Sequence, residues 1–213
     1  MYKILIGLTL CLAHCFGFTE YPPEFVAQVQ TYPNIMQSKD QCLPLKGNYE
    51  HAQTYVCDPS RLLTVTQINR LNSMLQEIRN MGDREEGGCN PNNPHPVVAV
   101  ALVNKLKVGN EVPDTLLSYA SIFAYYLFNE WSLPSTCHTG SDKMIIFYSK
   151  DDGVLYTFAG NLLEKKLSSQ QLINIAVQAR LPFTNGIHEG LAYLIQRYRE
   201  AISTGRADIF SKV

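Results

Sequence analysis

Oxygen-bearing side chains follow three expected strands of this 213-residue chain, at the point where each strand ends. They are Asp58 after the first strand, Asn104 after the second, and Asp151 with Asp152 after the third. Open α/β sheets bind ligands at the carboxyl ends of their strands, and carboxylate and amide oxygens suit a hard cation such as Ca²⁺. With a metal ion, the same carboxylates could also position water for attack on a phosphate ester.

The same residues are typical of turns, and this interpretation is favoured. Asp58 precedes a proline that ends a strand, and residues 151–153 read Asp-Asp-Gly, a common hairpin loop. The chain contains no EF-hand pattern. A Ca²⁺ site at Asp58, Asn104, Asp151 and Asp152 is therefore one hypothesis for this edge, beside a purely structural use.

Two other pairs fall short of a catalytic motif. His188 and Glu189 begin like a zinc-protease helix, but position 192 is Ala192 where a second histidine is required. We expect His188 near the surface at the start of a helix. Cys137 and His138 could pair a thiol with a base, but a cysteine of a secreted chain is more often bridged. Dinucleotide, Walker and G-x-S-x-G motifs are absent.

The strands that must position these residues are clear in the sequence. Residues 143–158 predict a β-hairpin in which an apolar strand and a β-branched strand flank an Asp-Gly turn. Residues 97–103 read VVAVALV, which is typical of a central parallel strand buried on both faces. Residues 51–57 form the first expected strand.

Four helices follow from apolar residues at helical spacing, over residues 65–81, 113–131, 169–181 and 187–204. Capping boxes of Thr64 with Gln67 and of Ser168 with Gln171 mark two helix starts. Pro182 is expected to interrupt the third helix. The order β-α-β-α-β-β-α-α predicts an α/β sandwich with right-handed crossovers. We expect a mixed, mostly parallel sheet with a C-terminal hairpin strand and helices on both faces.

Length and composition indicate one globular domain, with 46% hydrophobic and 17% charged residues. The formal charge of -1 and the lack of a basic cluster argue against nucleic acid as a partner. Residues 1–17 predict a signal peptide, with Lys3 before an apolar run, so the protein is expected to be secreted. Residues 18–50 are expected to form an irregular arm with one or two helical turns at residues 24–30. Residues 51–204 are expected to form the domain and 205–213 a short tail, with no transmembrane span after the signal peptide.

Cleavage of the signal peptide leaves four cysteines, which allow three disulfide connectivities: Cys42, Cys57, Cys89 and Cys137. Cys89 and Cys137 each precede a strand, so both are expected at the amino end of a parallel sheet. Cys57 ends its strand at the opposite edge and should not reach them. The predicted bridges are therefore Cys89 with Cys137 and Cys42 with Cys57.

Five segments between residues 55 and 202 together resemble a TPM domain: YVCDPSRLLT, VVAVALV, CHTGSDKMIIFYS, DDGVLYTFAG and NGIHEGLAYLIQRYREAI. Their order and spacing are similar to the modulator of levamisole receptor family of nematodes, a branch of TPM domains. The resemblance implies an extracellular auxiliary domain of acetylcholine-gated channels, within a membrane-associated receptor complex. Family members have a C-terminal membrane span, and residues 205–213 contain no such stretch.

Two functional hypotheses follow from the resemblance. The first is a non-catalytic extracellular interaction domain related to receptor modulators. The alternative is an acid-phosphatase-like or Ca²⁺-binding hydrolase, as described for some other TPM domains, with Asp58 and Asp151 as the positions that would inherit the site. The first is favoured because no carboxylate pair lies on a rigid element at fixed spacing.

Overall fold

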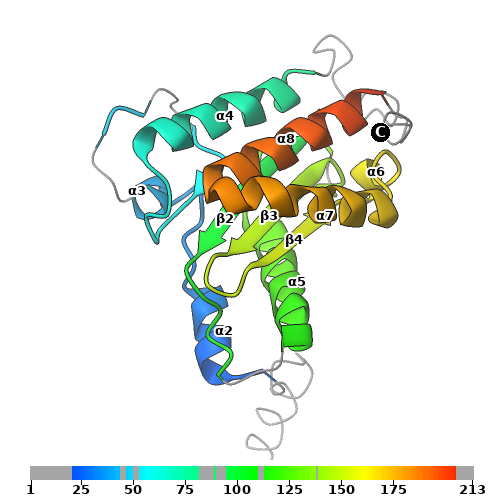
Figure 1. Cartoon of the computed structure of the whole chain (residues 1–213). Helices are drawn as coiled ribbons and strands as arrows, with labels where there is room; N and C mark the ends of the chain where they lie inside the picture. Colours follow the sequence, from blue (N-terminus) through cyan, green and yellow to red (C-terminus); the bar gives the residue numbers. More distant parts are fainter. Residues whose placement is uncertain are drawn as a thin grey trace, which may run out of the picture.

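The computed structural model describes residues 21–43, 47–49, 53–81, 89, 95–109, 113–137 and 139–204. The expected signal peptide and C-terminal tail lie outside the described residues. Within the described part, one sheet lies between helices that cover its two faces (Figure 1). The expected order of strands and long helices is confirmed, with three short helices added.

The sheet has four strands in the order β1-β2-β3-β4: β1 (Val56–Cys57), β2 (Val97–Val103), β3 (Lys143–Ser149) and β4 (Val154–Ala159). The first three strands are parallel, and β4 returns antiparallel to β3 as the predicted hairpin. All seven residues of β2 are buried, which explains its uninterrupted apolar sequence. The predicted mixed, mostly parallel sheet is confirmed.

β1 is shorter than the sequence indicates. Residues 51 and 52 lie outside the described part, and the strand itself spans only Val56–Cys57. Just before it, the Tyr55 backbone nitrogen donates to the Asn72 side-chain oxygen at 2.8 Å, instead of continuing a strand ladder. The Asn72 side chain of α4 (Val65–Arg79) thus takes the place of β2 as the partner of the Tyr55 N–H. The sequence of residues 51–57 gives no sign of this contact.

The helices form two layers on opposite faces of the sheet. On one face lie α4 (Val65–Arg79), α7 (Ser169–Asn185) and α8 (Ile187–Thr204), and on the other lies α5 (Pro113–Glu130), with α2 (Pro23–Gln30) beside it (Figure 1). Adjacent residues of β4 point to opposite faces of the sheet and so contact different helical layers. Thr157 shares a 2.8 Å hydrogen bond with Tyr198 of α8, whereas Phe158 packs against Phe128 of α5.

This layering changes the expected handedness of the crossovers. The connections β1-α4-β2 and β2-α5-β3 step in the same direction across the sheet, but α4 and α5 cover opposite faces. The two connections therefore have opposite hands, so the right-handed rule holds for only one of them. The departure is a property of the whole sheet, which no local pattern encodes.

The third long helix does not stop at its proline. α7 begins at the predicted capping box and continues through Pro182 to Asn185, so the proline lies within the last turn of the helix and does not end it. Gly186, with φ of 147°, makes the turn into α8. Gly190 lets the two helices approach closely, since a Cβ there would lie 2.3 Å from the Phe183 ring.

The arm before the first strand contains the helix expected at residues 24–30, and the rest of its described part is more ordered than expected. Its described part contains α2 and the short α3 (Lys39–Cys42). Phe25 and Val29 of α2 are buried, and Phe25 packs edge-on against Phe123 of α5. A further short helix, α6 (Asn161–Glu164), follows β4. The arm is thus part of the domain core.

Two disulfides have the predicted pairing. Cys42–Cys57 joins the arm to the end of β1, with a Cα–Cα distance of 4.3 Å, and Cys89–Cys137 joins the loops at the opposite edge, at 4.8 Å. Cys137 is thus bridged and has no free thiol for nucleophilic chemistry, and His138 lies outside the described residues. In the described part of the chain, no helix combines the length and apolar character needed to cross a bilayer.

Candidate functional site

The loops at the carboxyl ends of β1, β2 and β3 meet at one edge of the sheet, as the parallel arrangement predicts. The Asp151 backbone nitrogen donates to the Asn104 carbonyl at 2.7 Å, and the Lys150 nitrogen donates to the Val103 carbonyl at 3.0 Å. Asp58 follows β1, the strand next to β2. The topology therefore brings the loops of all four predicted ligand residues to this edge.

The Asp58 carboxylate is used by its own turn. Its two oxygens accept backbone N–H groups of Leu62 at 3.0 Å and Leu63 at 2.8 Å, and the residue is buried. Burial raises the pKa of Asp58, and the amide donors oppose that rise. The geometry is that of a turn that leads into α4.

Asp152 also holds backbone. One of its oxygens accepts the Ser149 hydroxyl at 2.5 Å and the Leu106 backbone N–H at 2.8 Å, which ties the segment after β2 to the β3–β4 hairpin. Asp151 is exposed and lies 3.9 Å from Lys150, itself about half exposed, so this pair contributes little to stability. Among the described residues, no group of three or more His, Cys, Asp or Glu side chains could hold a metal ion. A Ca²⁺ site at this edge stays an untested hypothesis beside the structural use of these residues.

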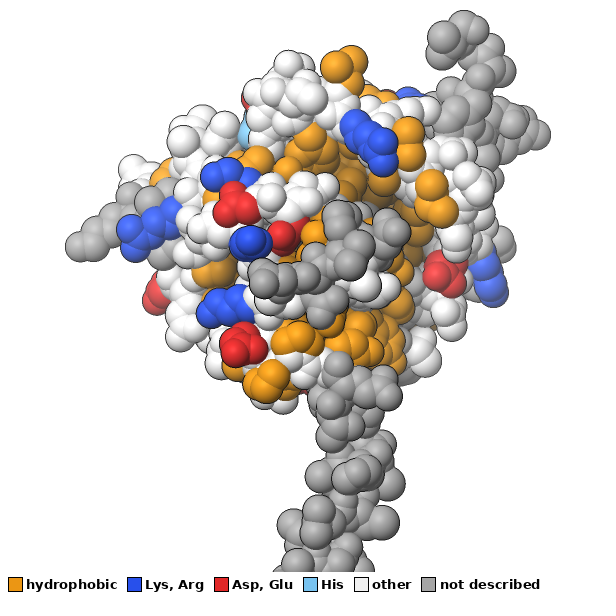
Figure 2. Space-filling model, turned by 60° about the horizontal axis from the view of Figure 1, so that its bottom comes forward, with side chains coloured by type: hydrophobic (Ala, Val, Ile, Leu, Met, Phe, Trp, Pro, Cys, Tyr) orange, Lys and Arg blue, Asp and Glu red, His pale blue; other side chains and the backbone are white. Residues whose placement is uncertain are grey.

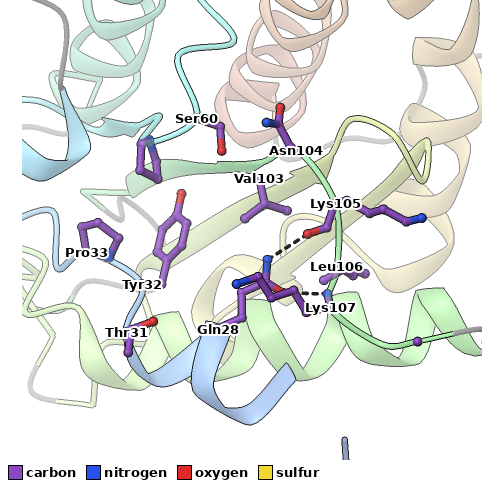
Figure 3. A pocket seen from close by; sticks show the side chains of 12 residues that line it. Gln28, Thr31, Tyr32, Pro33, Ser60, Val103, Asn104, Lys105, Leu106 and Lys107 are labelled. Carbon is purple, nitrogen blue, oxygen red and sulfur yellow. Dashed lines mark hydrogen bonds between the residues drawn. The ribbon is translucent and has the colours of Figure 1, made fainter. Parts of the chain in front are cut away.

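A cavity of about 570 Å³ opens at the same edge, between the end of α2 and the segment after β2 (Figure 3). Its lining residues come from three segments: Gln28, Thr31, Tyr32, Pro33, Pro59, Ser60, Val103, Asn104, Lys105, Leu106, Lys107 and Gly109. Residues 104, 105, 107 and 109 are exposed, whereas Leu106 and Val108 are buried. Asn104, Lys105 and Lys107 thus form one rim of the cavity and have exposed side chains, and the Lys105 side chain extends away from Gln28 and Tyr32 (Figure 3).

Gln28 fixes that rim to α2. Its side-chain nitrogen donates to the Lys105 carbonyl at 2.8 Å, and its side-chain oxygen accepts the Lys107 backbone N–H at 2.9 Å, as the dashed lines in Figure 3 show. One amide side chain thus pairs with the backbone as a neighbouring strand would. The Lys105 and Lys107 side chains are exposed, and the contacts of these two residues with Gln28 involve their backbone.

Tyr32 forms the floor between β1 and β2. Its hydroxyl lies 3.0 Å from the Cys57 carbonyl, and 2.9 Å from both the carbonyl and the N–H of Leu102. Burial raises the pKa of Tyr32 well above its ordinary value, opposed by the hydrogen bond with Leu102. The phenol therefore stays protonated. It hydrogen-bonds the backbone of the sheet and does not act as a base.

The arm that carries Tyr32 is braced from both sides. The Pro33 carbonyl accepts the Trp131 indole N–H at 3.1 Å, and the Asp58 backbone N–H donates to the Cys42 carbonyl at 2.8 Å. With the Cys42–Cys57 bridge, these contacts fix the cavity wall to the sheet.

Sequence reasoning did not identify Gln28, Tyr32, Lys105 or Lys107. Apart from the helical turns at residues 24–30, the arm was expected to be irregular, and a glutamine or tyrosine there carries no motif. The available signal was the pair Phe25 and Val29, whose helical spacing indicates a buried helix face.

His188 differs from its expected position. It lies at the start of α8, as predicted, but is buried and not near the surface. Its Nδ1 lies 3.2 Å from a carboxylate oxygen of Glu189. α8 packs on α4 and α7, an arrangement that the sequence does not show.

The fold and this edge define the class of the protein: a TPM-like α/β domain with a disulfide-braced arm. A solution NMR structure of the N-terminal domain of a protein from P. gingivalis has a similar fold. That structure has a TM-score of 0.52 and 16% sequence identity, and the similarity covers 83% of this chain and 91% of that one. No curated protein matches the sequence.

The family is shown by the sequence itself. Residues 27–153, more than half of the chain, match the family described as "Modulator of levamisole receptor-1". The chain therefore belongs to this family, and the predicted family resemblance is confirmed. The matched part begins in α2 and ends in the β3–β4 turn, so it includes every residue that lines the cavity.

Proposed function

We propose that this protein is a non-catalytic extracellular domain that binds and modulates an acetylcholine-gated channel of the levamisole type. The observation that carries the proposal is the family match over residues 27–153. The family name supports a receptor-associated, modulator-like role. The channel is the partner that this role requires.

An extracellular location is supported by the two disulfides, because such bridges persist in oxidising compartments. The predicted signal peptide over residues 1–17 is in agreement with export. Both features are expected of a domain that meets the outer part of a channel in the plasma membrane.

A binding role at the cavity edge is supported by how its polar residues are used. The Asp58 carboxylate and the Tyr32 phenol are engaged with backbone groups, so neither is positioned as a free base or nucleophile. By contrast, Asn104, Lys105 and Lys107 have exposed side chains on a rim whose backbone Gln28 holds in place. A fixed rim with two cations suits an acidic surface on the channel.

The test is co-expression of the protein with a levamisole-sensitive channel in oocytes, with the acetylcholine-evoked current as readout. We expect the wild-type protein to change the current and Lys105→Glu/Lys107→Glu to abolish most of that change. Lys165→Glu is the matched control, because Lys165 is exposed but lies outside the cavity and the matched residues.

Two outcomes would count against the proposal. A wild-type protein that reaches the cell surface without changing the current would refute channel modulation. An equal loss in the rim variant and the Lys165 control would refute the cavity rim as the binding surface.

A further inference from the structure

α7 exposes a row of apolar side chains that no described part of the chain covers. Ile173, Val177 and Leu181 are 55%, 51% and 74% exposed, and they follow one another at intervals of four residues. The opposite side of the helix is buried through Ile175 and Ala179. α7 is therefore apolar on both sides, whereas a surface helix usually has a polar outer face.

Its neighbour α8 shows the usual arrangement. The exposed residues of α8 include Glu189, Gln196 and Arg199, and its inner face carries buried residues such as Leu194. The two helices are consecutive in the chain and pack against each other as one hairpin. The apolar outer row is thus specific to α7.

The opposite helical layer offers a comparison. Figure 2 views the molecule from its lower side and shows hydrophobic side chains on that face as well. On α5, Leu117 and Tyr125 are about half exposed, but Ser121 lies between them and Tyr125 packs edge-on against Phe158. α5 therefore has no continuous exposed row.

The charge on α7 is low and suits self-association. Of the 17 residues from Ser169 to Asn185, Arg180 is the single charged one. Val177 is the central residue of the helix, with Ile173 and Leu181 four residues to either side. In an antiparallel pair centred on Val177, Ile173 would face Leu181 of the second copy, and Arg180 would face Asn174. No like charges would meet.

We propose that α7 pairs with α7 of a second copy of this chain, antiparallel across a two-fold axis through Val177. The surface is complementary to itself in its apolar pattern, as a two-fold interface requires, and the pairing brings no like charges together. Side chains spaced four residues apart form the ridge that most commonly interdigitates between helices.

The predicted dimer is weak. Three partly exposed side chains supply a few hundred Å² per copy, below the roughly 800 Å² per partner of a standard stable interface. Association is therefore expected at high local concentration, as for two copies held on one oligomeric channel. α7 lies outside residues 27–153, so this pairing is independent of the proposed channel-binding rim.

Sedimentation equilibrium of the purified protein, from about 10 µM to about 1 mM, tests the proposal. The wild type should show a reversible monomer–dimer equilibrium. Val177→Lys and Val177→Glu should each weaken it about tenfold or more, because like charges would meet on the axis. Leu117→Lys, which places a charge at an equally exposed position on α5, should leave it unchanged.

An equimolar mixture of Val177→Lys and Val177→Glu gives the sharper result. Position 177 faces itself only in the two-fold pair, so the mixture should associate more strongly than either variant alone. Thermal unfolding of each variant should match the wild type because the position is exposed. A wild type that stays monomeric at the highest concentration, or a mixture that does not associate, would overturn the proposal. The apolar row of α7 would then be assigned to contact with another protein.

Discussion

The Tyr32 hydroxyl lies 2.9 Å from both the backbone nitrogen and the carbonyl oxygen of Leu102. A side chain of the arm thus pairs with β2 at the level where β1 has ended. The hydroxyl accepts the Leu102 N–H and has a single hydrogen to donate, either to Leu102 or to the Cys57 carbonyl. The arm therefore completes the sheet at the edge that forms the cavity.

Removal of this hydroxyl should destabilise the protein. Tyr32→Phe leaves the Leu102 N–H without its partner in a buried strand, so the free energy of unfolding should fall by about 1–3 kcal/mol. Urea denaturation followed by circular dichroism measures the change. Tyr125→Phe is the control, because Tyr125 is 55% exposed and its loss should stay within about 0.5 kcal/mol. Equal midpoints for the two variants would contradict the role given to Tyr32.

Alkaline pH should destabilise the fold through Tyr198. Burial raises the pKa of Tyr198 to about 12, opposed by its hydrogen bond with Thr157. Between the unfolded value near 10 and the folded value, the native state retains a proton that the unfolded state has lost. Stability is therefore fully present below pH 10 and falls by about 1.4 kcal/mol per pH unit for this group above it.

Denaturation curves between about pH 9 and pH 11.5 test this linkage. Tyr198→Phe should lower stability at neutral pH and reduce the slope above pH 10. Tyr32→Phe should also reduce the slope, because burial raises the pKa of Tyr32 in the same direction. A slope that neither variant changes would show that other groups cause the alkaline loss.

The two disulfides should differ in their reactivity toward reductants. Cys89 is exposed, whereas both Cys42 and Cys57 are fully buried. A thiolate must reach a sulfur to attack it, so mild reduction of the folded protein should open Cys89–Cys137 first. Alkylation and peptide mapping at successive times measure the order. Reduction in denaturant is the control, in which both bridges should open at similar rates. Earlier labelling of Cys42 in the folded protein would contradict the burial seen here.

Calcium should not be needed for the turn after β1. Asp58→Asn replaces an acceptor with a donor opposite a backbone N–H, so the melting temperature should fall equally with and without millimolar Ca²⁺. Calorimetric titration of the wild type should give no binding heat. A Ca²⁺-dependent rise in melting temperature that is lost in Asp58→Asn would instead establish the metal site at this edge.

Much of the domain was determined by local patterns in the sequence. The apolar run of residues 97–103 forms β2 with the predicted bounds, and the capping boxes of Thr64 with Gln67 and of Ser168 with Gln171 begin α4 and α7. Local patterns succeed here because burial on both faces and cap hydrogen bonds depend on neighbouring residues. The disulfide pairing also followed, since parallel strands fix the edge at which each loop emerges.

The candidate site was decided by tertiary structure. Asp58 and Asp152 could be placed at the correct edge from strand order alone, but their backbone partners at Leu63 and Leu106 depend on loop conformation. Gln28 and Tyr32 reach the sheet only because α2 packs on α5, and they pair with residues 70 to 79 positions away in the chain. Contacts over such separations depend on how the helical layers stack, so neither hydrophobic periodicity nor a short motif could identify them.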